Sequence, residues 1–513
     1  MPRRNGPIPL IWPGYTAHWY GTLDDMASAS RIGGRALADL LPEVRDMPGP
    51  VYSALARAVT SLVLDGRVVT ETRMPSERDL AAALQLSRAT VTAAYDALRA
   101  DGFLASRTGS GSYVTVPPGA QPHPSLRRWS TRGIGDTADV IDLSCAALPA
   151  PPGLIPDAVA DAAPRLAPYL LGDGYEPAGL PALRTAVADR FTRRGVSTRA
   201  EQILITNGSL HGFDLLLRLL LAPGDRVITE LPTYPGALDA IRSNGGRVMP
   251  VAMHPAGGWQ VDQLNATLRQ TAARLAYLTP DFHNPTGALI REAERRSVLK
   301  TARSTGTTVV VDESFVDLGF SASSGGERPT AALDPSVITV GSLSKPIWGG
   351  LRVGWLRATT DLVHRLAALR TSIDMGGPII DQVVAASLVE RIEPIAAKRV
   401  AALRPQRDAL VAALATQLPD WQFTLPQGGL SLWAGLPAPL STPLTMLAAQ
   451  SGVVIVPGSR FGVDGTLERF LRLPYSLPAD RLTEAVRRIS EVWAQLAEHA
   501  NAIGLAPRQL VVA

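Results

Sequence analysis

The sequence predicts a multidomain protein in which a small α+β module with a helix-turn-helix precedes a large α/β domain with a smaller C-terminal lobe. Two observations predict this order. Residues 47–116 have the pattern of short amphipathic helices followed by a small hairpin. Residues 139–500 instead alternate short apolar runs with longer segments of helical period, which is typical of a largely parallel sheet with helices between its strands.

Composition divides the chain into five zones. They are an N-terminal extension (1–46), the helical module (47–116), a proline-rich linker (117–138), the large domain (139–500) and a C-terminal tail (501–513). The extension holds an amphipathic stretch from Ile32 to Val44, which we expect to form a helix that packs on the module. At 513 residues, the chain is long enough for about three to four folding units.

Charge and cysteine content limit the classes of function. The 50 basic and 46 acidic residues give a net charge of +4, which is too small to indicate a polyanionic partner by itself. No apolar run approaches the length of a membrane span, and prolines interrupt the N-terminus, so we expect neither a transmembrane helix nor a signal peptide. Cys145 is the only cysteine. It excludes an intrachain disulfide and a cysteine cluster for a metal, and it favours a reducing, cytoplasmic location; we expect no metal site.

The module has the outline of a winged helix-turn-helix. We expect helices over residues 51–64, 79–84 and 88–101, and strands over 103–105 and 112–114. Ser76 and Ser87 are suited to cap the second and third helices, because a serine oxygen accepts a hydrogen bond from the first free N–H groups. Gly102 ends the third helix. In this fold that helix enters the major groove of DNA with its N-terminal residues foremost.

The module resembles the DNA-binding domain of the GntR regulator family. The resembling residues are Pro75-Ser76-Glu77-Arg78, Leu80-Ala81, Ser87-Arg88-Ala89-Thr90-Val91, Tyr95, Leu98, Gly102 and, at the wing, Gly109-Ser110-Gly111. The resemblance implies a double-stranded DNA partner, and the residues that would contact it are Arg78, Ser87, Arg88, Thr90 and Gly109. Arginine suits guanine edges and phosphates, and hydroxyl groups suit phosphates; the alternative for both arginines is a solvated position on a helix. Thr92 stands where some members of the family have a second arginine.

The large domain contains five short apolar runs that we expect as buried strands. They cover residues 203–206, 226–229, 275–278, 308–311 and 337–340. Polar motifs directly follow four of them. Ligands of open α/β sheets bind outside the carboxyl ends of the strands. The four motifs are therefore expected to meet at one site, although they lie far apart in the chain.

Three of these motifs each carry one kind of candidate ligand group. Gly208 and Ser209 precede a helix expected over 211–221, whose first N–H groups suit a phosphate or belong only to a helix cap. Asn284 lies in a rigid turn, where its amide either faces a ligand or belongs to the turn. Asp312 ends a buried strand, and a carboxylate there needs a partner. That partner is either a cationic ring nitrogen or the backbone of a structural cap.

The fourth motif has the most specific chemistry. Lys345 follows the strand over 337–340 and is suited to form a Schiff base with an aldehyde cofactor when its amine is partly desolvated. Ser342, Ser344 and Arg352 lie close to it in the sequence and supply a cradle for a phosphate group.

Together these motifs resemble those of the fold-type I aminotransferases that depend on pyridoxal 5′-phosphate (PLP). The resemblance runs from about Asp142 to Leu496. It includes Gly174-Tyr175-Glu176-Pro177-Ala178-Gly179, Leu183-Arg184, Pro223-Gly224-Asp225, Pro232-Thr233-Tyr234-Pro235 and Arg469-Phe470-Leu471-Arg472-Leu473. The fold it implies is an α/β domain of the PLP-dependent aminotransferase type with a smaller C-terminal lobe.

The resemblance also implies a role for each candidate residue. Lys345 would form the internal aldimine, Asp312 would pair with the pyridinium nitrogen, and Asn284 would approach the ring hydroxyl. Tyr234 would stack on the ring and Arg472 would bind the carboxylate of a substrate or effector; the alternatives are a core position for Tyr234 and a surface position for Arg472. The implied phosphate ligands are Gly208, Ser209, Ser342, Ser344, Arg352 and, from a neighbouring subunit, Tyr175.

One residue departs from the family pattern. The family commonly has a tyrosine shortly after the aspartate, and that tyrosine donates to the ring oxygen. Here the run is Asp312-Glu313-Ser314-Phe315. Because Phe315 has no hydroxyl, the sequence leaves open whether the site turns a substrate over.

The two halves together resemble the MocR-type (GabR-like) bacterial regulators, a subfamily of the GntR regulators whose aminotransferase-like domain senses an effector. The resemblance implies a PLP-dependent transcription regulator that senses PLP or an amino compound through a Lys345 aldimine and forms a head-to-tail homodimer. The alternative is an active PLP-dependent aminotransferase of an amino acid or related amine with an accessory DNA-binding module. A repressor with a vestigial cofactor site is a third case, which the retention of all four site groups disfavours.

Overall fold

The computed structural model describes most of the chain. It describes residues 31–41, 44–45, 50–64, 68, 72–107, 111–115, 140–254, 258–320, 327–463 and 466–502. The chain divides into two compact units, Met1–Gln121 and Pro122–Ala513, and each is described by itself. Gly109 and the predicted linker lie outside the described residues.

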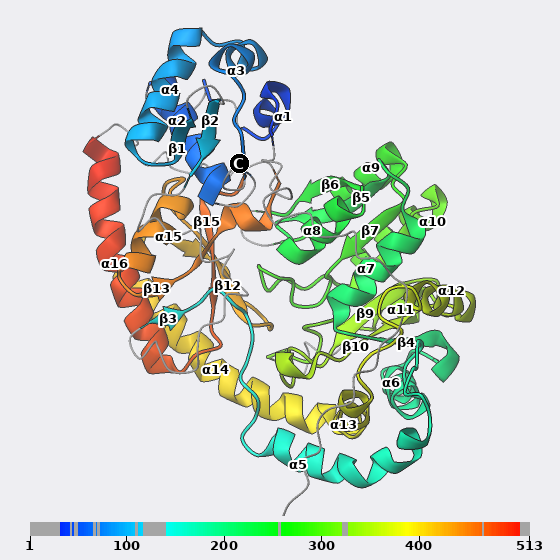
Figure 1. Cartoon of the computed structure of the whole chain (residues 1–513). Helices are drawn as coiled ribbons and strands as arrows, with labels where there is room; N and C mark the ends of the chain where they lie inside the picture. The colour runs from blue at the N-terminus through cyan, green and yellow to red at the C-terminus, as the bar shows by residue number, and fades with distance from the viewer. Residues whose placement is uncertain are drawn as a thin grey trace, which may run out of the picture. The chain divides into compact units, whose positions relative to one another are not determined.

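The first unit contains the helices and the hairpin expected of a winged helix-turn-helix (Figure 1). Its elements are α1 (Gly34–Ala38), α2 (Val51–Leu64), α3 (Glu77–Leu84), α4 (Arg88–Ala100), β1 (Leu104–Arg107) and β2 (Gly111–Val114). The Oγ atoms of Ser76 and Ser87 each accept a hydrogen bond at 3.1 Å from the backbone three residues later. Both predicted helix caps are therefore confirmed, and Gln85, with φ 54°, makes the turn between α3 and α4.

The N-terminal extension packs on this unit through α1. Leu37 is fully buried and belongs to the same hydrophobic cluster as Leu55, Leu80 and Leu98. The backbone N–H of Ile32 donates to the carbonyl of the chain segment that precedes α3, at 3.1 Å. The helix is shorter than the stretch of residues 32–44 that the sequence indicates, because only residues 34–38 are helical.

A seven-stranded sheet forms the centre of the second unit. Its strands are β4 (Ile203–Thr206), β5 (Arg226–Leu231), β6 (Arg247–Ala252), β7 (Leu275–Leu278), β8 (Thr308–Asp312), β9 (Ile338–Ser342) and β10 (Gly354–Arg357). They lie in the order β4-β10-β9-β8-β7-β5-β6. Only β10 runs antiparallel to its neighbours, whereas the other paired strands run parallel. All five predicted strands are confirmed, within a residue or two at their ends.

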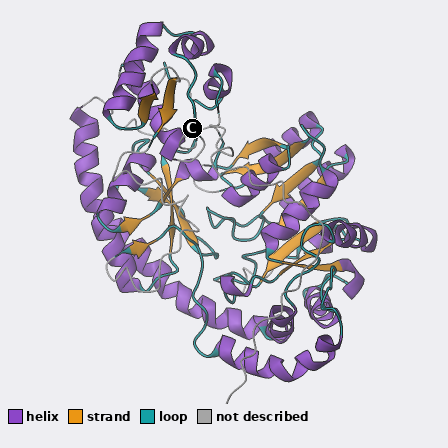
Figure 2. Cartoon of the chain, viewed as in Figure 1, coloured by secondary structure: helices purple, strands orange, loops and turns teal. Residues whose placement is uncertain are grey.

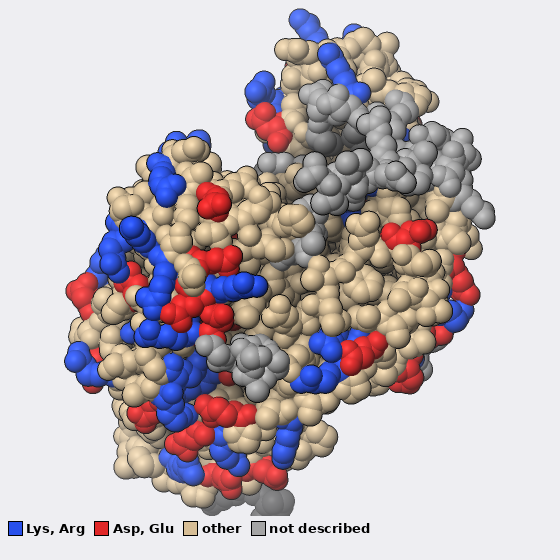
Figure 3. Space-filling model, turned by 180° about the vertical axis from the view of Figure 1, so that it is seen from behind, with Lys and Arg blue, Asp and Glu red and all other residues tan. Residues whose placement is uncertain are grey.

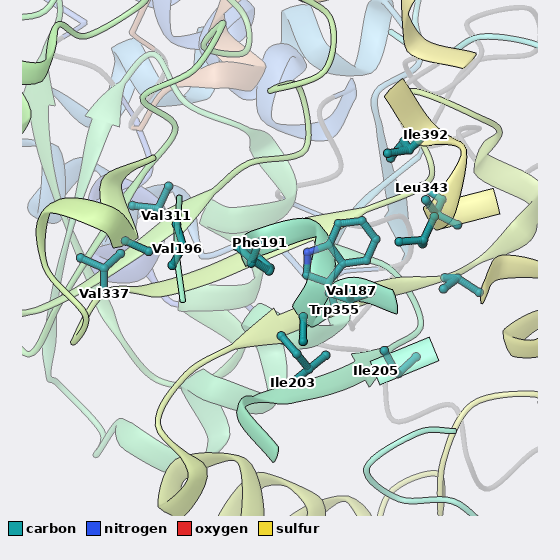
Figure 4. Packing of buried hydrophobic residues seen from close by; sticks show 14 of the residues in the cluster. Val187, Phe191, Val196, Ile203, Ile205, Val311, Val337, Leu343, Trp355 and Ile392 are labelled. Atoms are coloured by element: carbon teal, nitrogen blue, oxygen red, sulfur yellow. The ribbon is translucent and has the colours of Figure 1, made fainter. Parts of the chain in front are cut away.

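Helices cover both faces of this sheet (Figure 2). They are α5 (Leu154–Ala162), α6 (Pro181–Arg193), α7 (Ser209–Leu220), α8 (Pro235–Ser243), α9 (Val261–Thr271), α10 (Glu292–Thr305), α11 (Thr330–Leu333), α12 (Thr360–Arg370) and α13 (Ile379–Glu390), with the 3₁₀ segments η3 (Ala163–Leu171), η4 (Ala200–Gln202) and η5 (Gly349–Leu351). Side chains alternate between the faces. Val311 joins the cluster around Phe191 and Trp355 that Figure 4 shows, and Val310 joins the opposite cluster around Phe213. Burial on both sides explains why these strands are continuously apolar.

The C-terminal lobe has its own sheet and core, as the sequence predicts. It contains α14 (Ile392–Gln417), β11 (Gln422–Phe423), β12 (Ser431–Gly435), α15 (Ser441–Gln450), β13 (Val453–Val454), β14 (Val456–Pro457), η6 (Gly458–Phe461), β15 (Phe470–Pro474) and α16 (Ala479–Ala502). Four of its strands pair in the order β11-β12-β15-β14. The short β3 (Ile141–Asp142) pairs with β13. The start of the large domain therefore returns to the lobe that ends it.

Two general properties of the surface bear on function. Of the helices in the described part of the chain, none combines the length and the apolar character needed to cross a membrane. On the face of the second unit seen in Figure 3, acidic and basic side chains are interspersed. This mixture agrees with the small net charge of +4.

Candidate functional site

The polar motifs of the large domain meet at one edge of the seven-stranded sheet. The parallel strands β4, β5, β7, β8 and β9 all end at this edge. Because β10 runs in the opposite direction, it begins at the same edge, where Gly354 pairs with Thr206 on one side and Ser342 on the other. The residues before β10 and after the other strands are therefore brought together, as the sequence predicts.

The first group of these residues forms a small polar cradle. Arg352 Nη2 donates to the carbonyl oxygen of Asn207 at 2.7 Å. A Cβ on Gly208, whose φ is 94°, would lie 3.1 Å from that same nitrogen, so only glycine leaves the guanidinium this position. Ser314 Oγ donates to Ser209 Oγ at 3.0 Å. The first turn of α7, two hydroxyls and a guanidinium thus lie together, which is a donor set suited to phosphate.

Lys345 lies half-buried directly after β9. Its Nζ donates to the carbonyl oxygen of Ala146 at 2.8 Å and lies 5.6 Å from the centre of the Phe315 ring. The backbone N–H of Ser344 donates to Ser342 Oγ at 3.3 Å, which folds the turn that carries the lysine. Phe315 is therefore beside the amine, and the hydroxyl that a tyrosine would bring there is missing.

Asp312 is buried at the end of β8. Tyr277 Oη donates to its Oδ2 at 2.7 Å, and the backbone N–H of Ser314 donates to its Oδ1 at 2.8 Å. Burial raises the pKa of Asp312, and the hydrogen bonds from Ser314 and Tyr277 and the nearby charge of Lys345 oppose that rise. The carboxyl is held in place and poised to pair with a cationic partner.

Tyr277 is a site residue that the sequence reading missed. It pairs with Val310 in the parallel sheet, and Asp312 is two residues further along the same strand. Because side chains alternate with period two, Tyr277 and Asp312 point to the same face. Both residues are visible in the predicted strands of the sequence, but only the pairing of β7 with β8 shows that they lie next to each other.

The amide oxygen of Asn284 is suited to accept a hydrogen bond from a ligand. The residue is buried, and its Oδ1 accepts no hydrogen bond from any of the described residues. A buried amide oxygen without a donor is costly. The ring hydroxyl of PLP is a suitable donor, so the amide, the cradle, the amine and the carboxyl together fit this cofactor.

Tyr234 and Arg472 lie on two further elements near these groups. Tyr234 is half-buried at the start of α8, and a Cβ on Gly236 would lie 2.6 Å from its ring, so the glycine leaves the ring its place. Arg472 on β15 is buried, lies 4.9 Å from the centre of the Phe461 ring and donates to the carbonyl of Ser144. Arg472 is thus no solvated surface residue.

A short segment connects Arg472 with Lys345. The carbonyl of Ser144 accepts from Arg472 and that of Ala146 accepts from Lys345. Cys145 lies between them and is exposed. Arg472 and Lys345, two of the cationic groups of the site, therefore bind carbonyls two residues apart in one short segment.

Tyr175 lies at the surface of the large domain. It lies in the loop before α6 with 57% of its surface exposed. Its backbone N–H donates a local hydrogen bond to Asp173 Oδ1 at 3.1 Å. The predicted role of Tyr175 at the phosphate of a neighbouring subunit stays a prediction.

Glu230 is a second buried carboxyl near the site that the sequence reading missed. It lies on β5, where Oε1 accepts from the backbone N–H of Thr279 and Oε2 from the hydroxyl of Thr233, the latter at 3.2 Å. Burial raises the pKa of Glu230 to about 7, in spite of these hydrogen bonds. The apolar pattern of the strand gave no indication of a carboxyl inside the protein.

Four of the five predicted DNA contacts lie at the starts of α3 and α4. Arg78 is exposed, and Arg88 is exposed with its Nε 3.8 Å from Glu77 Oε2. Ser87 Oγ and Thr90 Oγ1 are hydrogen-bonded at 2.8 Å, so both belong to the cap of α4. Gly109 lies outside the described residues, so the structure does not place it.

Thr92, the departure from the family pattern, also has a partner. Its hydroxyl donates to Glu77 Oε2 at 2.8 Å. The same carboxylate lies 3.8 Å from Arg99 Nη2. Thr92 therefore helps to join α3 to α4.

Among the residues that the structure describes, no group of three His, Cys, Asp or Glu side chains is arranged to hold a metal ion.

Comparison with known families gives two matches in the same chain. Residues 138–489 match the family described as "Aminotransferase class I and II". Residues 51–114 match "Bacterial regulatory proteins, gntR family". The first match covers more than half of the chain and contains every candidate residue of the PLP site.

Individual relatives represent both architectures. The chain is 33% identical over 363 residues to the 2-aminoadipate transaminase of Thermus thermophilus, covering 67% of this chain and 87% of that enzyme. It is 29% identical over 457 residues to the probable rhizopine catabolism regulatory protein MocR of Rhizobium meliloti, covering 81% and 88%. The crystal structure of the kynurenine aminotransferase of Pyrococcus horikoshii, in complex with PMP, matches with a TM-score of 0.65 and 27% identity, covering 70% and 92%.

The similarity to the aminotransferases is thus limited to the large unit. The alignment with MocR is longer and also extends over the small unit. Both the sheet-edge site and the helix-turn-helix are present in one chain. The chain belongs to the class I and II aminotransferase family and, through its gntR-family domain, to the MocR-type regulators that combine these two parts.

Proposed function

We propose that this protein is a PLP-dependent, DNA-binding transcription regulator whose aminotransferase-like domain senses PLP or an amino compound through Lys345. The presence of a gntR-family domain and an aminotransferase domain in one chain supports DNA binding coupled to a small molecule. When bound, PLP supplies an aldehyde carbon that reacts with amines and a pyridinium ring that withdraws electrons.

Different side chains of the protein would bind different parts of such a cofactor. Lys345 Nζ supplies the amine. Asp312, held by Tyr277 and Ser314, supplies a carboxylate for a ring nitrogen. Asn284 Oδ1 supplies an acceptor for a ring hydroxyl. Gly208, Ser209, Ser342, Ser344 and Arg352 supply the phosphate cradle, and Tyr234 supplies the face on which the ring stacks.

Phe315 is the single observation that favours sensing over turnover. The groups that bind the cofactor are present, but the position beside Lys345 lacks a hydroxyl donor. A site that binds an amine but converts it slowly to product stays occupied in proportion to the amine's concentration. That is the task of a sensor domain rather than of an enzyme.

The amino-compound effector is proposed to carry a carboxylate. Arg472 and Lys345 bind the neighbouring carbonyls of Ser144 and Ala146, so a cation for a carboxylate and an amine for exchange lie along one segment. An amino acid offers both complementary groups. Its arrival would change what both carbonyls accept, and the segment is then the first part of the protein to respond.

We further propose a head-to-tail homodimer in which Tyr175 of each chain reaches the phosphate bound by the other. Leu171, with 91% of its surface exposed, and Tyr175 lie in neighbouring parts of the chain and offer apolar surface to that copy. The predicted linker of about 22 residues spans at most about 70 Å. This reach is enough for each DNA-binding module to meet the large unit of its partner.

The test is a binding assay with DNA from upstream of the protein's own gene. Fluorescence anisotropy of the labelled DNA is measured at fixed salt with and without PLP, because phosphate contacts make affinity salt-dependent. We expect binding that resists competitor DNA and changes with PLP. Binding no tighter than to random DNA would argue against the regulator.

Lys345→Ala tests the role of the amine. We expect the variant to lose the visible absorption of lysine-bound PLP and the response of DNA binding to PLP, while it keeps part of its DNA affinity. A variant that remains folded but loses all specific DNA binding would show that the two roles are not separable.

The second candidate function is an active aminotransferase whose DNA-binding module is accessory. The 33% identity to a 2-aminoadipate transaminase and the retained Lys345 and Asp312 favour it. Steady amino transfer from a series of amino donors to a keto acid distinguishes the two. Many turnovers per minute would favour the enzyme, whereas one amino transfer per site would favour the sensor.

A further inference from the structure

An ion pair between the buried Arg370 and the half-buried Asp374 lies next to the phosphate cradle. Arg370, the last residue of α12, has 0% of its side chain exposed. Its Nε donates to Asp374 Oδ1 at 2.6 Å and its Nη2 to Asp374 Oδ2 at 3.1 Å. A guanidinium inside a protein needs partners for its remaining donors. Arg370 Nη1 donates to two backbone carbonyls. They are the carbonyl of Ile205 and, at 3.2 Å, the carbonyl of Pro177.

The carboxylate of this pair fixes the first residue of the cradle. Asn207 Nδ2 donates to Asp374 Oδ2 at 3.1 Å. The backbone N–H of Asn207 donates to His211 Nδ1 at 3.0 Å, and His211 Nε2 lies 3.7 Å from Asp374 Oδ2. Since the carbonyl of Asn207 accepts from Arg352, each of its backbone polar groups and its amide nitrogen has a partner.

The protonation of these groups agrees with the geometry. Burial raises the pKa of Asp374, but hydrogen bonds and charge from Arg370 outweigh this and leave it below its usual range. Burial and the charge of Arg370 lower the pKa of His211. A neutral imidazole accepts at Nδ1, as the hydrogen bond from Asn207 requires, and presents Nε2–H to the carboxylate.

The same pair also holds two exposed loops together. Arg370 donates to the carbonyl of Pro177 in the first loop. In the second loop, the backbone N–H of Gly376 donates to Asp374 Oδ1 at 3.3 Å. A Cβ on Gly376, whose φ is 132°, would lie 2.7 Å from the carbonyl oxygen of Glu176. The loops around Pro177 and Gly376 are therefore in contact. Each carries an exposed apolar side chain, Tyr175 and Met375.

We propose that Arg370 and Asp374 are positioning residues that connect the phosphate cradle to these two loops. A phosphate ester that binds at Gly208 and Ser209 then orders residues 174–179 and 374–377 through Asn207. The inference rests on the proposed function for the ligand, but not on DNA binding. The hydrogen bonds of the pair lead to Asn207 of the cradle, to Ile205 of β4 and to the two loops.

The test separates the phosphate from the aldehyde. Asp374→Asn removes the charge that aligns Arg370 and Asn207, and Asp361→Asn on the exposed surface of α12 is the matched control. Dissociation constants are measured for PLP and for pyridoxal, which has the aldehyde but no phosphate. We expect Asp374→Asn to weaken PLP binding about tenfold, to change pyridoxal binding less than about twofold, and the control to change neither.

Hydrogen exchange on the full chain supplies a second readout. In the wild type, PLP should slow exchange in residues 174–179 and 374–377 as well as in the first turn of α7. In Asp374→Asn, saturating PLP should protect only the first turn of α7. If this variant fails to fold, Asp374→Glu keeps the charge but displaces it, and the same results are expected.

The outcomes are distinguishable. Equal weakening of PLP and pyridoxal, or no weakening of either, would overturn the positioning role while leaving the proposed cofactor intact. Unchanged protection of both loops in the variant would overturn the connection. A wild-type protein that binds neither ligand would overturn the proposed cofactor and this inference with it.

Discussion

Phe315 packs beside Lys345 at the place where a hydroxyl donor would meet the ring oxygen of a bound cofactor. Phe315→Tyr restores that donor without changing the size of the ring. We expect the rate of amino transfer to a keto acid to rise at least about tenfold, the size of one hydrogen bond formed in the transition state. Rates with a series of amino donors provide the measurement.

Phe320→Tyr is the control, because Phe320 is another buried phenylalanine of the same region that lies among Arg404, Arg407 and Tyr475. It adds the same hydroxyl away from the amine and should leave the rate unchanged. If Phe315→Tyr behaves like this control, the missing hydroxyl is not what limits turnover.

Glu230 makes the stability of the large unit depend on pH. Its pKa is about 7 in the folded chain against an ordinary value of 4.5. A raised pKa means that folding favours the protonated form, so its contribution to stability is complete below about pH 4.5 and is lost as the pH rises through about 7. Glu230→Gln should therefore flatten the pH profile and increase stability at pH 8 by about 3 kcal/mol.

Urea unfolding of the wild type and the variant between about pH 5 and 8 measures this difference. The exposed Glu201→Gln serves as the control and should keep the wild-type profile. A Glu230→Gln profile that parallels the wild type would mean that another group is responsible for the dependence.

Residues that follow strands were predictable from the sequence, and residues that act across the structure were not. Lys345, Asp312 and Asn284 each come directly after a short apolar run. Tyr277 binds Asp312 across 35 positions of the chain, and Arg370 binds Ile205 across 165 positions. Local periodicity has no information about such partners.

The two serine caps of the helix-turn-helix separate helix stability from DNA contact. Ser76 and Ser87 accept the same hydrogen bond at the same distance, 3.1 Å. Replacing either with alanine should cost about 1 kcal/mol in the free energy of unfolding. Only Ser87 begins α4, the helix that we predict to enter the major groove, so Ser87→Ala should weaken DNA binding several-fold more than Ser76→Ala.

Denaturant unfolding and DNA anisotropy at one salt concentration measure the two effects. Ser76→Ala is the matched control, because it removes a cap without removing a predicted contact. Equal losses of DNA affinity in both variants would mean that Ser87 acts through α4 alone.

Several strands that the sequence did not indicate are edge strands or very short, although β10, β12 and β15 lie inside their sheets. β6 is half-exposed and contains Pro250, which a strand at the edge of a sheet tolerates. β11, β13 and β14 have two residues each, too few to display a period. β10 reads like its parallel neighbours, and only its pairing reveals that it is antiparallel.

The two units have separate hydrophobic cores, so a ligand of one should stabilise that one. The cluster around Leu37 and Leu80 belongs to the first unit, and the clusters around Phe191 and Phe213 belong to the second. PLP at about 100 times its dissociation constant should stabilise the second unit by about 2.7 kcal/mol. Scanning calorimetry should show one transition that shifts with PLP and one that does not.

Lys345→Ala is the control for this experiment, and its shift should be much smaller than that of the wild type. Equal shifts of both transitions would show that the two units unfold together. In that case ligand binding would reach the DNA-binding module through a direct coupling of stability.

Cys145 gives the molecule a built-in reporter. It is the only thiol in 513 residues and is exposed between the carbonyls that accept from Lys345 and Arg472. A thiol-reactive dye therefore attaches at one known position in the natural sequence, with no other cysteine to remove. The emission of that dye would follow, in real time and in a single cuvette, how the segment between Lys345 and Arg472 responds when the proposed amino-acid effector is added.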